Sequence, residues 1–217
     1  MVLVSPKRPV SVGTVARALS CFECEDLRLV APRCDHLARG SRNASKGAQY
    51  ILWRAAQHDS LTAALADVEL SVGFTRWTAG RLNAFRSLGD LLASPLMASA
   101  LSGALPTDMA PAAATELVAG KVVEVQKQQQ QQQKRQRPRL ALVFGREERG
   151  FDAGELEACS FSCSLPIGRL QESLSLSHAV SIVLSQLFQL RQQQSGFVLP
   201  ASIADLAEGY QDVGFER

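Results

Sequence analysis

Residues 140–191 constrain the fold more than any other part of the sequence. They begin with a short apolar run, residues 140–144, followed by a charged turn bounded by Gly145 and Gly150. A second short apolar run, residues 161–165, leads into a serine-rich turn. Short apolar runs that alternate with helical stretches are typical of a parallel sheet with helices on both faces.

Two helices are predicted within this segment. Asp152 and Glu155 are three residues apart and match a capping box, which predicts a helix ending near Cys159. From residue 174 to 191 the apolar residues recur at helical spacing. They are Leu176, Val180, Val183, Leu187 and Leu190, widened by Ala179, Ile182 and Leu184. A stripe of that width predicts burial against more than one neighbour.

The first half of the chain continues the alternation. Apolar runs predict strands, and apolar residues at helical spacing predict helices. The strands are expected at residues 2–4, 27–30 and 69–72, and the helices at residues 12–22, 46–56 and 60–67. The sequence therefore predicts a single α/β domain, which is what a chain of 217 residues can support.

Residues 106–139 break this pattern. An Ala/Pro-rich stretch leads to Lys127, six consecutive glutamines and the basic residues 134–139. Such a polar tract buries too little apolar area to offset its ordering entropy, so we expect a disordered surface insertion. Its basic cluster either contacts RNA phosphates or is a solvated flank. Residues 1–105 and 140–195 would then form one domain, followed by a tail, residues 196–217, with a short helix near residues 202–208.

The overall composition limits the class of protein. A net charge of +2 excludes a polycation that coats nucleic acid, yet it permits a local basic patch. No apolar stretch approaches the roughly 20 residues of a membrane span, and no signal peptide precedes the first motif. Five cysteines, an odd number, favour a reducing compartment over a disulfide framework. We expect a soluble intracellular protein with no membrane partner, located in the cytoplasm or, as the alternative, in an organelle.

Three segments carry residues suited to chemistry, and each has a plainer interpretation. Residues 145–150 follow a strand, where open α/β sheets bind ligands, or they form only a charged turn. Residues 165–180 place serines at a helix start, where they bind a polar group or merely cap the helix. Residues 11–17 end in Arg17, a phosphate ligand or a solvated cation. Zinc ligation by Cys21, Cys24, Cys34 and His36 is a further alternative, disfavoured by the strand predicted between the pairs.

Taken together and in this order, the three segments resemble the motifs of the SpoU/TrmH family of SPOUT methyltransferases. The motif N-x-G-x-x-x-R is matched by residues 11–17, with Ser11 in place of asparagine. The motif F-G-R-E-x-x-G is matched by residues 144–150 without a departure. The third motif, I/L-P-x(6)-S-L-N-L-x-x-A-V, is matched by residues 165–180, with Ser175 in place of asparagine.

This resemblance implies a fold and an activity. The fold would be a SPOUT-type parallel sheet flanked by helices, with a C-terminal trefoil knot. The activity would be S-adenosylmethionine-dependent ribose 2'-O-methylation of RNA, either the tRNA anticodon loop, as in the TrmJ-like branch, or rRNA. A catalytically silent SPOUT-like RNA-binding protein is the alternative. The family also implies a homodimer.

The resemblance also implies roles for individual residues. Arg17, Glu147 and Ser173 would be catalytic, and no metal site is implied. Arg17 would reach the active site of the dimer and position the ribose, because a guanidinium is too weak a base to remove a proton. Glu147 would orient Arg17 or a backbone donor. The cofactor contacts would come from Phe74, Thr75, Arg76, Gly145, Leu165, Glu172, Ser173 and Leu174.

Overall fold

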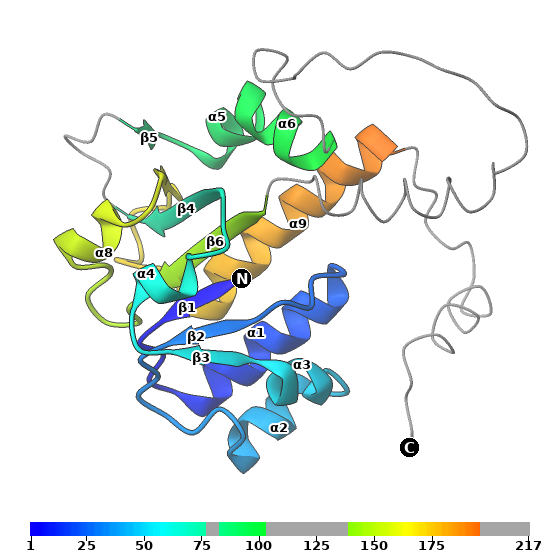
Figure 1. Cartoon of the computed structure of the whole chain (residues 1–217), viewed down its shortest axis with the longest axis vertical. Helices are drawn as coiled ribbons and strands as arrows, with labels where there is room; N and C mark the ends of the chain where they lie inside the picture. The colour runs from blue at the N-terminus through cyan, green and yellow to red at the C-terminus, as the bar shows by residue number, and fades with distance from the viewer. Residues whose placement is uncertain (77–82, 103–138, 196–217) are drawn as a thin grey trace, which may run out of the picture.

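A computed structural model describes residues 1–76, 83–102 and 139–195 of the chain (Figure 1). In these ranges the strands form one sheet in the order β3-β2-β1-β6-β4-β7-β5. Every pairing between neighbouring strands is parallel, as predicted. The strands are β1 (Val2–Val4), β2 (Arg28–Val30), β3 (Ala56–His58), β4 (Leu70–Thr75), β5 (Ala84–Phe85), β6 (Leu140–Gly145) and β7 (Phe161–Ser164).

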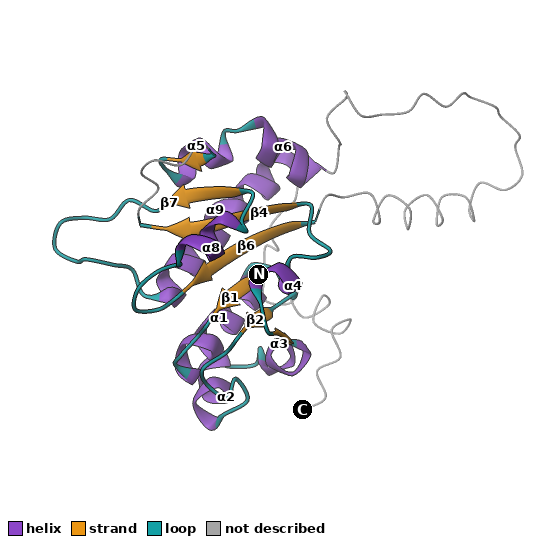
Figure 2. Cartoon of the chain, turned by 60° about the vertical axis from the view of Figure 1, so that its left-hand side comes forward, coloured by secondary structure: helices purple, strands orange, loops and turns teal. Residues whose placement is uncertain are grey.

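Helices cover both faces of the sheet. α1 and α9 pack together on one face, and Figure 2 shows α8 on the opposite face from α9. The helices are α1 (Pro9–Cys21), α2 (Arg39–Ser45), α3 (Gln49–Arg54), α4 (Leu61–Ala64), α5 (Leu88–Leu92), α6 (Pro95–Ser102), α8 (Ala153–Glu157) and α9 (Leu176–Ser195). None of the described helices is long and apolar enough to cross a membrane.

Alternating strand residues build two separate cores. Leu3 and Phe144 pack with α1 and α9 on one face of the sheet. Val4 and Val143 pack with α4 on the other. Successive side chains of a strand point to opposite faces, so both faces must be apolar when both are covered. This explains why the strands read as short, nearly continuous apolar runs.

The sheet changes winding direction between β1 and β6. The chain leaves β1 through α1 and returns as β2 on one side, whereas it leaves β6 through α8 and returns as β7 on the other. The loops at the carboxyl ends of β1 and β6 therefore diverge. Open α/β sheets bind ligands at such a point.

The predicted helix over residues 46–56 is present as the shorter helix α3, Gln49–Arg54. Lys46 and Gly47, whose φ angles are 45° and 96°, separate it from α2, which was not predicted. A left-handed backbone ends a helix. Residues 56–58 instead form β3, and the Ala56 N–H donates to Leu27 O at 3.0 Å. The predicted helix over residues 60–67 shortens to the single turn of α4.

Other predictions are corrected in detail. β5, α5 and α6 were not predicted. α9 contacts α1, α5 and β6, as its wide stripe predicted, but Ile182 is 43% exposed and lies outside the buried stripe. The insertion and the helix near residues 202–208 lie outside the described residues. The trefoil knot stays a prediction.

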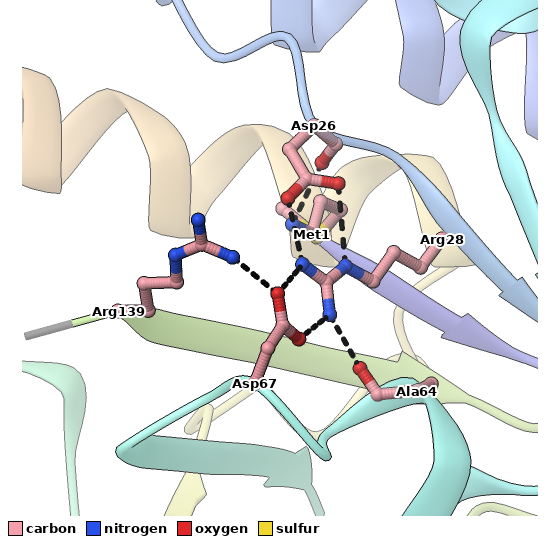
Figure 3. Close-up of polar contacts among 6 residues, drawn as sticks. All are labelled: Met1, Asp26, Arg28, Ala64, Asp67 and Arg139. Carbon is pink, nitrogen blue, oxygen red and sulfur yellow. Dashed lines mark hydrogen bonds and ion pairs between the residues drawn. The ribbon is translucent and has the colours of Figure 1, made fainter. Parts of the chain in front are cut away.

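An ion-pair network links residues at the amino ends of the strands (Figure 3). Arg28, whose side chain is 12% exposed, donates to Asp26 and Asp67 and, at 2.7 Å, to Ala64 O. Arg139 pairs with Asp67, so it ties the start of β6 to the residues before β4. The hydrogen bonds from Arg28 hold the pKa of Asp67 well below its usual range. We call these four side chains the amino-edge network.

Candidate cofactor pocket

A cavity of about 310 Å³ opens at the carboxyl ends of β4, β6 and β7. It is lined by residues from the loops that follow these three strands, which are far apart in the sequence. All eight residues predicted to contact the cofactor line this cavity: Phe74, Thr75, Arg76, Gly145, Leu165, Glu172, Ser173 and Leu174. The structure thus brings the predicted positions together, while their roles stay predictions.

Gly145 allows the backbone to turn from β6 into the cavity. Its φ of +148° is in the region that strongly favours glycine. A Cβ at this position would also lie 2.4 Å from Val4 O in the neighbouring strand β1. The glycine of the F-G-R-E motif is therefore required both by its conformation and by the close approach of β1.

Two stacked aromatic rings form one wall of the cavity. Phe74 and Phe144 lie with ring centroids 4.7 Å apart and an interplanar angle of 9°. Phe74 is only 5% exposed and belongs to the core that packs against α1 and α9. Its ring is therefore held mainly by the core.

Hydrogen bonds join the loop after β4 to the loop after β7. Ser164 Oγ donates to Arg76 O at 3.1 Å, and the Arg76 guanidinium donates to Glu172 O. Ser175 caps α9, because its Oγ accepts from the His178 N–H at 3.2 Å. The same Oγ lies 2.9 Å from His178 Nδ1. The serine that replaces the family's asparagine thus has a defined role at the helix start.

Arg146 forms ion pairs with residues at the start of the helix that follows the motif. It pairs with Glu155 at 2.8 Å and Asp152 at 3.0 Å, and Glu155 raises the pKa of Arg146 above its usual value. Asp152 and Glu155 also form the predicted capping box of α8. The arginine of F-G-R-E therefore holds the turn against α8.

Glu147 has one carboxylate oxygen in the cavity wall with no hydrogen-bond partner among the described residues. Its side chain is 10% exposed, and Oε1 is buried with no hydrogen bond among the described residues. Oε2 lies 4.0 Å from Arg8 Nε, the outer limit of an ion pair. A buried carboxylate oxygen without a donor is costly, so this atom is suited to receive a donor from a ligand.

Arg17 does not line the cavity of its own chain. It lies on the exposed side of α1, whereas Gly13 of the same motif is buried. A Cβ on Gly13 would lie 2.1 Å from Ser41 O, so the glycine allows α1 and α2 to cross closely. Ser11 lies in the first turn of α1, with its N–H donating to Arg8 O. The first motif therefore explains packing within the chain, but not a contact of Arg17 with the cavity.

Sequence reasoning missed two cations beside the cavity. Lys7 Nζ lies 2.6 Å from Glu148 Oε1, and Arg8 approaches Glu147. Both precede the first motif, and their sequence signal, a Lys-Arg pair directly after a predicted strand, was weak. The proposed zinc ligands are not gathered, because the described residues contain no group of three or more candidate ligands.

A family model matches part of the chain. Residues 105–185, which include the Gly145 turn and the start of α9, match the model of the SpoU rRNA methylase family. Over this stretch the chain is similar to the SpoU methylase family. The matched stretch covers the second and third motifs and excludes Arg17.

Named relatives are similar to most of the chain. The tRNA (cytidine-2'-O-)-methyltransferase TrmJ of Methanocaldococcus jannaschii is 24% identical over 188 residues, which cover 87% of this chain and 66% of the relative. The tRNA (cytidine/uridine-2'-O-)-methyltransferase TrmJ of Sodalis glossinidius is 28% identical over 214 residues, 96% of this chain and 68% of the relative. The chain thus spans about two thirds of these proteins, and just under two thirds of the archaeal one.

Solved structures share the fold. A probable methylase family protein from Haemophilus influenzae aligns with a TM-score of 0.65 and 22% identity, covering 90% of this chain and 65% of that chain. The SpoU methyltransferase AviRb from Streptomyces viridochromogenes, in complex with AdoMet, aligns with a TM-score of 0.56 and 14% identity, covering 88% and 60%. At these identities the likeness shows the α/β fold alone.

Proposed function

We propose that this chain is a member of the SpoU methylase family and transfers the methyl group of S-adenosylmethionine to a ribose 2'-hydroxyl of RNA. The observation that carries the proposal is the cavity, where the second and third motifs converge around a carboxylate oxygen of Glu147 that has no hydrogen bond among the described residues. The names of the TrmJ relatives make tRNA the first substrate to test, and rRNA the second.

The cavity suits the cofactor. Its volume, about 310 Å³, is at the lower end of the range of roughly 300–1,000 Å³ for small-molecule sites. The loops offer backbone donors and acceptors, and Phe74 and Phe144 offer an apolar wall. S-adenosylmethionine would supply an electrophilic methyl group on sulfur. The chain's own task is then to align the ribose oxygen with that methyl group and to exclude water.

We assign Glu147 to the ribose. Its Oε1 would accept the hydrogen of the 2'-hydroxyl, because no donor among the described residues satisfies it. Such a contact orients the oxygen lone pairs and draws the proton away as the new bond forms. Ser173, which lines the same cavity, would contribute a hydroxyl to cofactor or substrate.

The test is transfer of a labelled methyl group to unmodified tRNA and rRNA transcripts, followed by mapping of the modified ribose. We expect a single 2'-O-methylated nucleotide. Measurable cofactor binding with no transfer to any RNA would contradict the proposal and favour the catalytically silent RNA-binding alternative.

Arg17 would act in a homodimer. It is exposed and does not line the cavity of its own chain, so it would reach the partner's cavity to position the ribose. We expect Arg17→Ala to abolish transfer with little loss of cofactor affinity. Mixing Arg17→Ala with Glu147→Gln should then restore transfer, because one site of the mixed dimer has both residues intact. No restoration, or full activity of Arg17→Ala alone, would contradict this role.

The domain boundaries stay part of the proposal. Residues 1–105 and 140–195 would form one methyltransferase domain interrupted by residues 106–139, and residues 196–217 would be a tail. A variant that replaces residues 106–138 with a short Gly/Ser linker should keep its cofactor affinity. A loss of folding in that variant would show that the insertion belongs to the domain.

A further inference from the structure

Three cations, Lys7, Arg8 and Arg33, lie beside the cavity and have no role in the function proposed above. Lys7 and Arg8 follow β1, and Arg33 follows β2. All three therefore lie at the carboxyl edge of the sheet, next to the point where β1 adjoins β6 and the winding direction changes. We call these three residues the basic rim.

The backbone of the basic rim is held in place. The Ser5 N–H donates to Val30 O at 2.7 Å, and the Arg33 N–H donates to Pro6 O at 2.8 Å. The two loops are thereby joined. Lys7 Nζ in turn bonds Glu148 at 2.6 Å, in the loop that lines the cavity. A site that is ordered before binding loses less entropy when its ligand arrives.

The two arginines of the rim have hydrogen-bonding capacity to spare. The Arg8 side chain is 75% exposed, and its carboxylate neighbour Glu147 is 4.0 Å away. Arg33 is exposed and forms no ion pair with any carboxylate in the described part of the chain. Each guanidinium has five donors in a planar arrangement that matches a phosphate group.

The three cations of the rim outnumber the two carboxylates of the neighbouring loop, Glu147 and Glu148. The hydrogen bond from Lys7, and then the charges of Lys7, Arg33 and Arg8, hold the pKa of Glu148 below its usual value. Because Lys7 pairs closely with Glu148, the two exposed arginines remain beside the cavity, where they attract a polyanion.

We propose that Arg8 and Arg33 bind a backbone phosphate of the RNA next to the ribose that enters the cavity, while Lys7 holds their loop in place. This inference rests on the proposed function and describes how the same site recognises its substrate. Glu147 connects the two places, since its Oε2 faces Arg8 and the residue lines the cavity. A phosphate on Arg8 is therefore close to the ribose on Glu147. Phosphate contacts of this kind fix the position of the RNA without reading its sequence.

The test is RNA binding by the full chain, measured as fluorescence anisotropy of a labelled unmodified tRNA transcript at several salt concentrations. Arg8→Gln and Arg33→Gln should each raise the Kd about fivefold. The double variant should lower the slope of log K against log salt by about 1, the value for one lost phosphate contact. Cofactor affinity should not change.

Arg54→Gln is the matched control. The side chain of Arg54 is 65% exposed, and its guanidinium lies 3.7 Å from Glu25, much as that of Arg8 lies 4.0 Å from Glu147. Arg54 differs from Arg8 in position, because it precedes β3 and so lies at the amino ends of the strands. Its loss should leave both the Kd and the salt slope unchanged. An equal effect of Arg54→Gln and Arg8→Gln would show unspecific attraction and would overturn the proposal.

Lys7 needs a separate test because it acts through the loop. Lys7→Gln should raise the Kd for RNA, and Lys7→Arg, which can still pair with Glu148, should restore it. An unchanged Kd and salt slope in the Arg8/Arg33 double variant would overturn the proposal that the basic rim binds an RNA phosphate.

RNA binding requires no turnover. A lack of methyl transfer by the unaltered protein would therefore contradict the proposed function and leave the proposal for the basic rim intact.

Discussion

Charged groups are paired differently at the two ends of the strands, which we call the amino edge and the carboxyl edge of the sheet. At the amino edge, Arg28 bonds two carboxylates and a carbonyl, and Arg139 adds a second cation to Asp67 (Figure 3). At the carboxyl edge, Glu147 keeps a buried oxygen with no hydrogen bond to any residue in the described ranges, and Arg8 remains three-quarters exposed. Internal satisfaction stabilises a fold, whereas unsatisfied polar groups beside a cavity await a ligand.

The difference teaches which edge serves stability and which serves binding. Parallel strands place all their carboxyl ends together, and the loops there are free to vary without disturbing the sheet. The amino ends receive the chain from the covering helices, and in this protein an ion-pair network joins them. Variants at the two edges should therefore separate stability from function.

The largest effect is expected from Gly145→Ala, at the junction of sheet and cavity. The new Cβ would have to adopt an unfavourable φ and would collide with Val4 O. We expect a loss of about 3 kcal/mol in the free energy of unfolding, together with weaker cofactor binding. Urea denaturation and calorimetric titration measure the two. Normal stability of this variant would contradict the conclusion that the close contact with β1 requires a glycine at residue 145.

Glu147→Gln should be next, and it should affect function only. The amide keeps the shape and removes the charge that we assign to the ribose hydroxyl, so transfer should fall about 100-fold. The melting temperature should not fall, since Oε1 has no partner to lose among the described residues. Single-turnover methyl transfer and thermal denaturation measure both. A variant with a lower melting temperature and normal turnover would show that Glu147 stabilises the fold and does not act in methyl transfer.

Arg28→Ala should show the reverse pattern at the amino edge. It removes a mostly buried guanidinium that bonds Asp26, Asp67 and Ala64 O. We expect a loss of about 2 kcal/mol in the free energy of unfolding. Cofactor affinity of the folded protein should not change, because the network lies at the other end of the strands. Weaker cofactor binding at a temperature where the variant is fully folded would contradict the division between edges.

Asp67→Asn should have the smallest effect, of about 1 kcal/mol or less, because the carboxylate is partly exposed. The pKa of Asp67 is lower in the folded than in the unfolded chain, so its contribution is present above about pH 4 and is lost as the pH falls further. The unaltered protein should therefore lose stability more steeply in acid than Asp67→Asn. Urea denaturation between neutral and acidic pH measures this, and parallel curves would exclude Asp67 as a source of acid sensitivity.

Local sequence patterns predicted much of the pocket but only part of the fold. Residues 144–150 and 165–180 matched long family motifs, and the eight predicted cofactor contacts line one cavity. The helix predicted over residues 46–56 is shorter in the structure, because Lys46 and Gly47 adopt left-handed conformations that apolar spacing does not reveal. β3 has little apolar character and forms because it pairs with β2.

The sequence by itself determined the parallel α/β class, the strand-turn-helix order of residues 140–191 and the positions of the motifs. These features depend on residues that are neighbours in the chain, where spacing and turn chemistry act directly. Only the tertiary structure decided which charges are neutralised. Arg28 and Asp67 are 39 residues apart, and Lys7 and Glu148 are 141 apart. Whether a charge finds a partner depends on the strand order, and so the fold separates a satisfied amino edge from a carboxyl edge open to ligands.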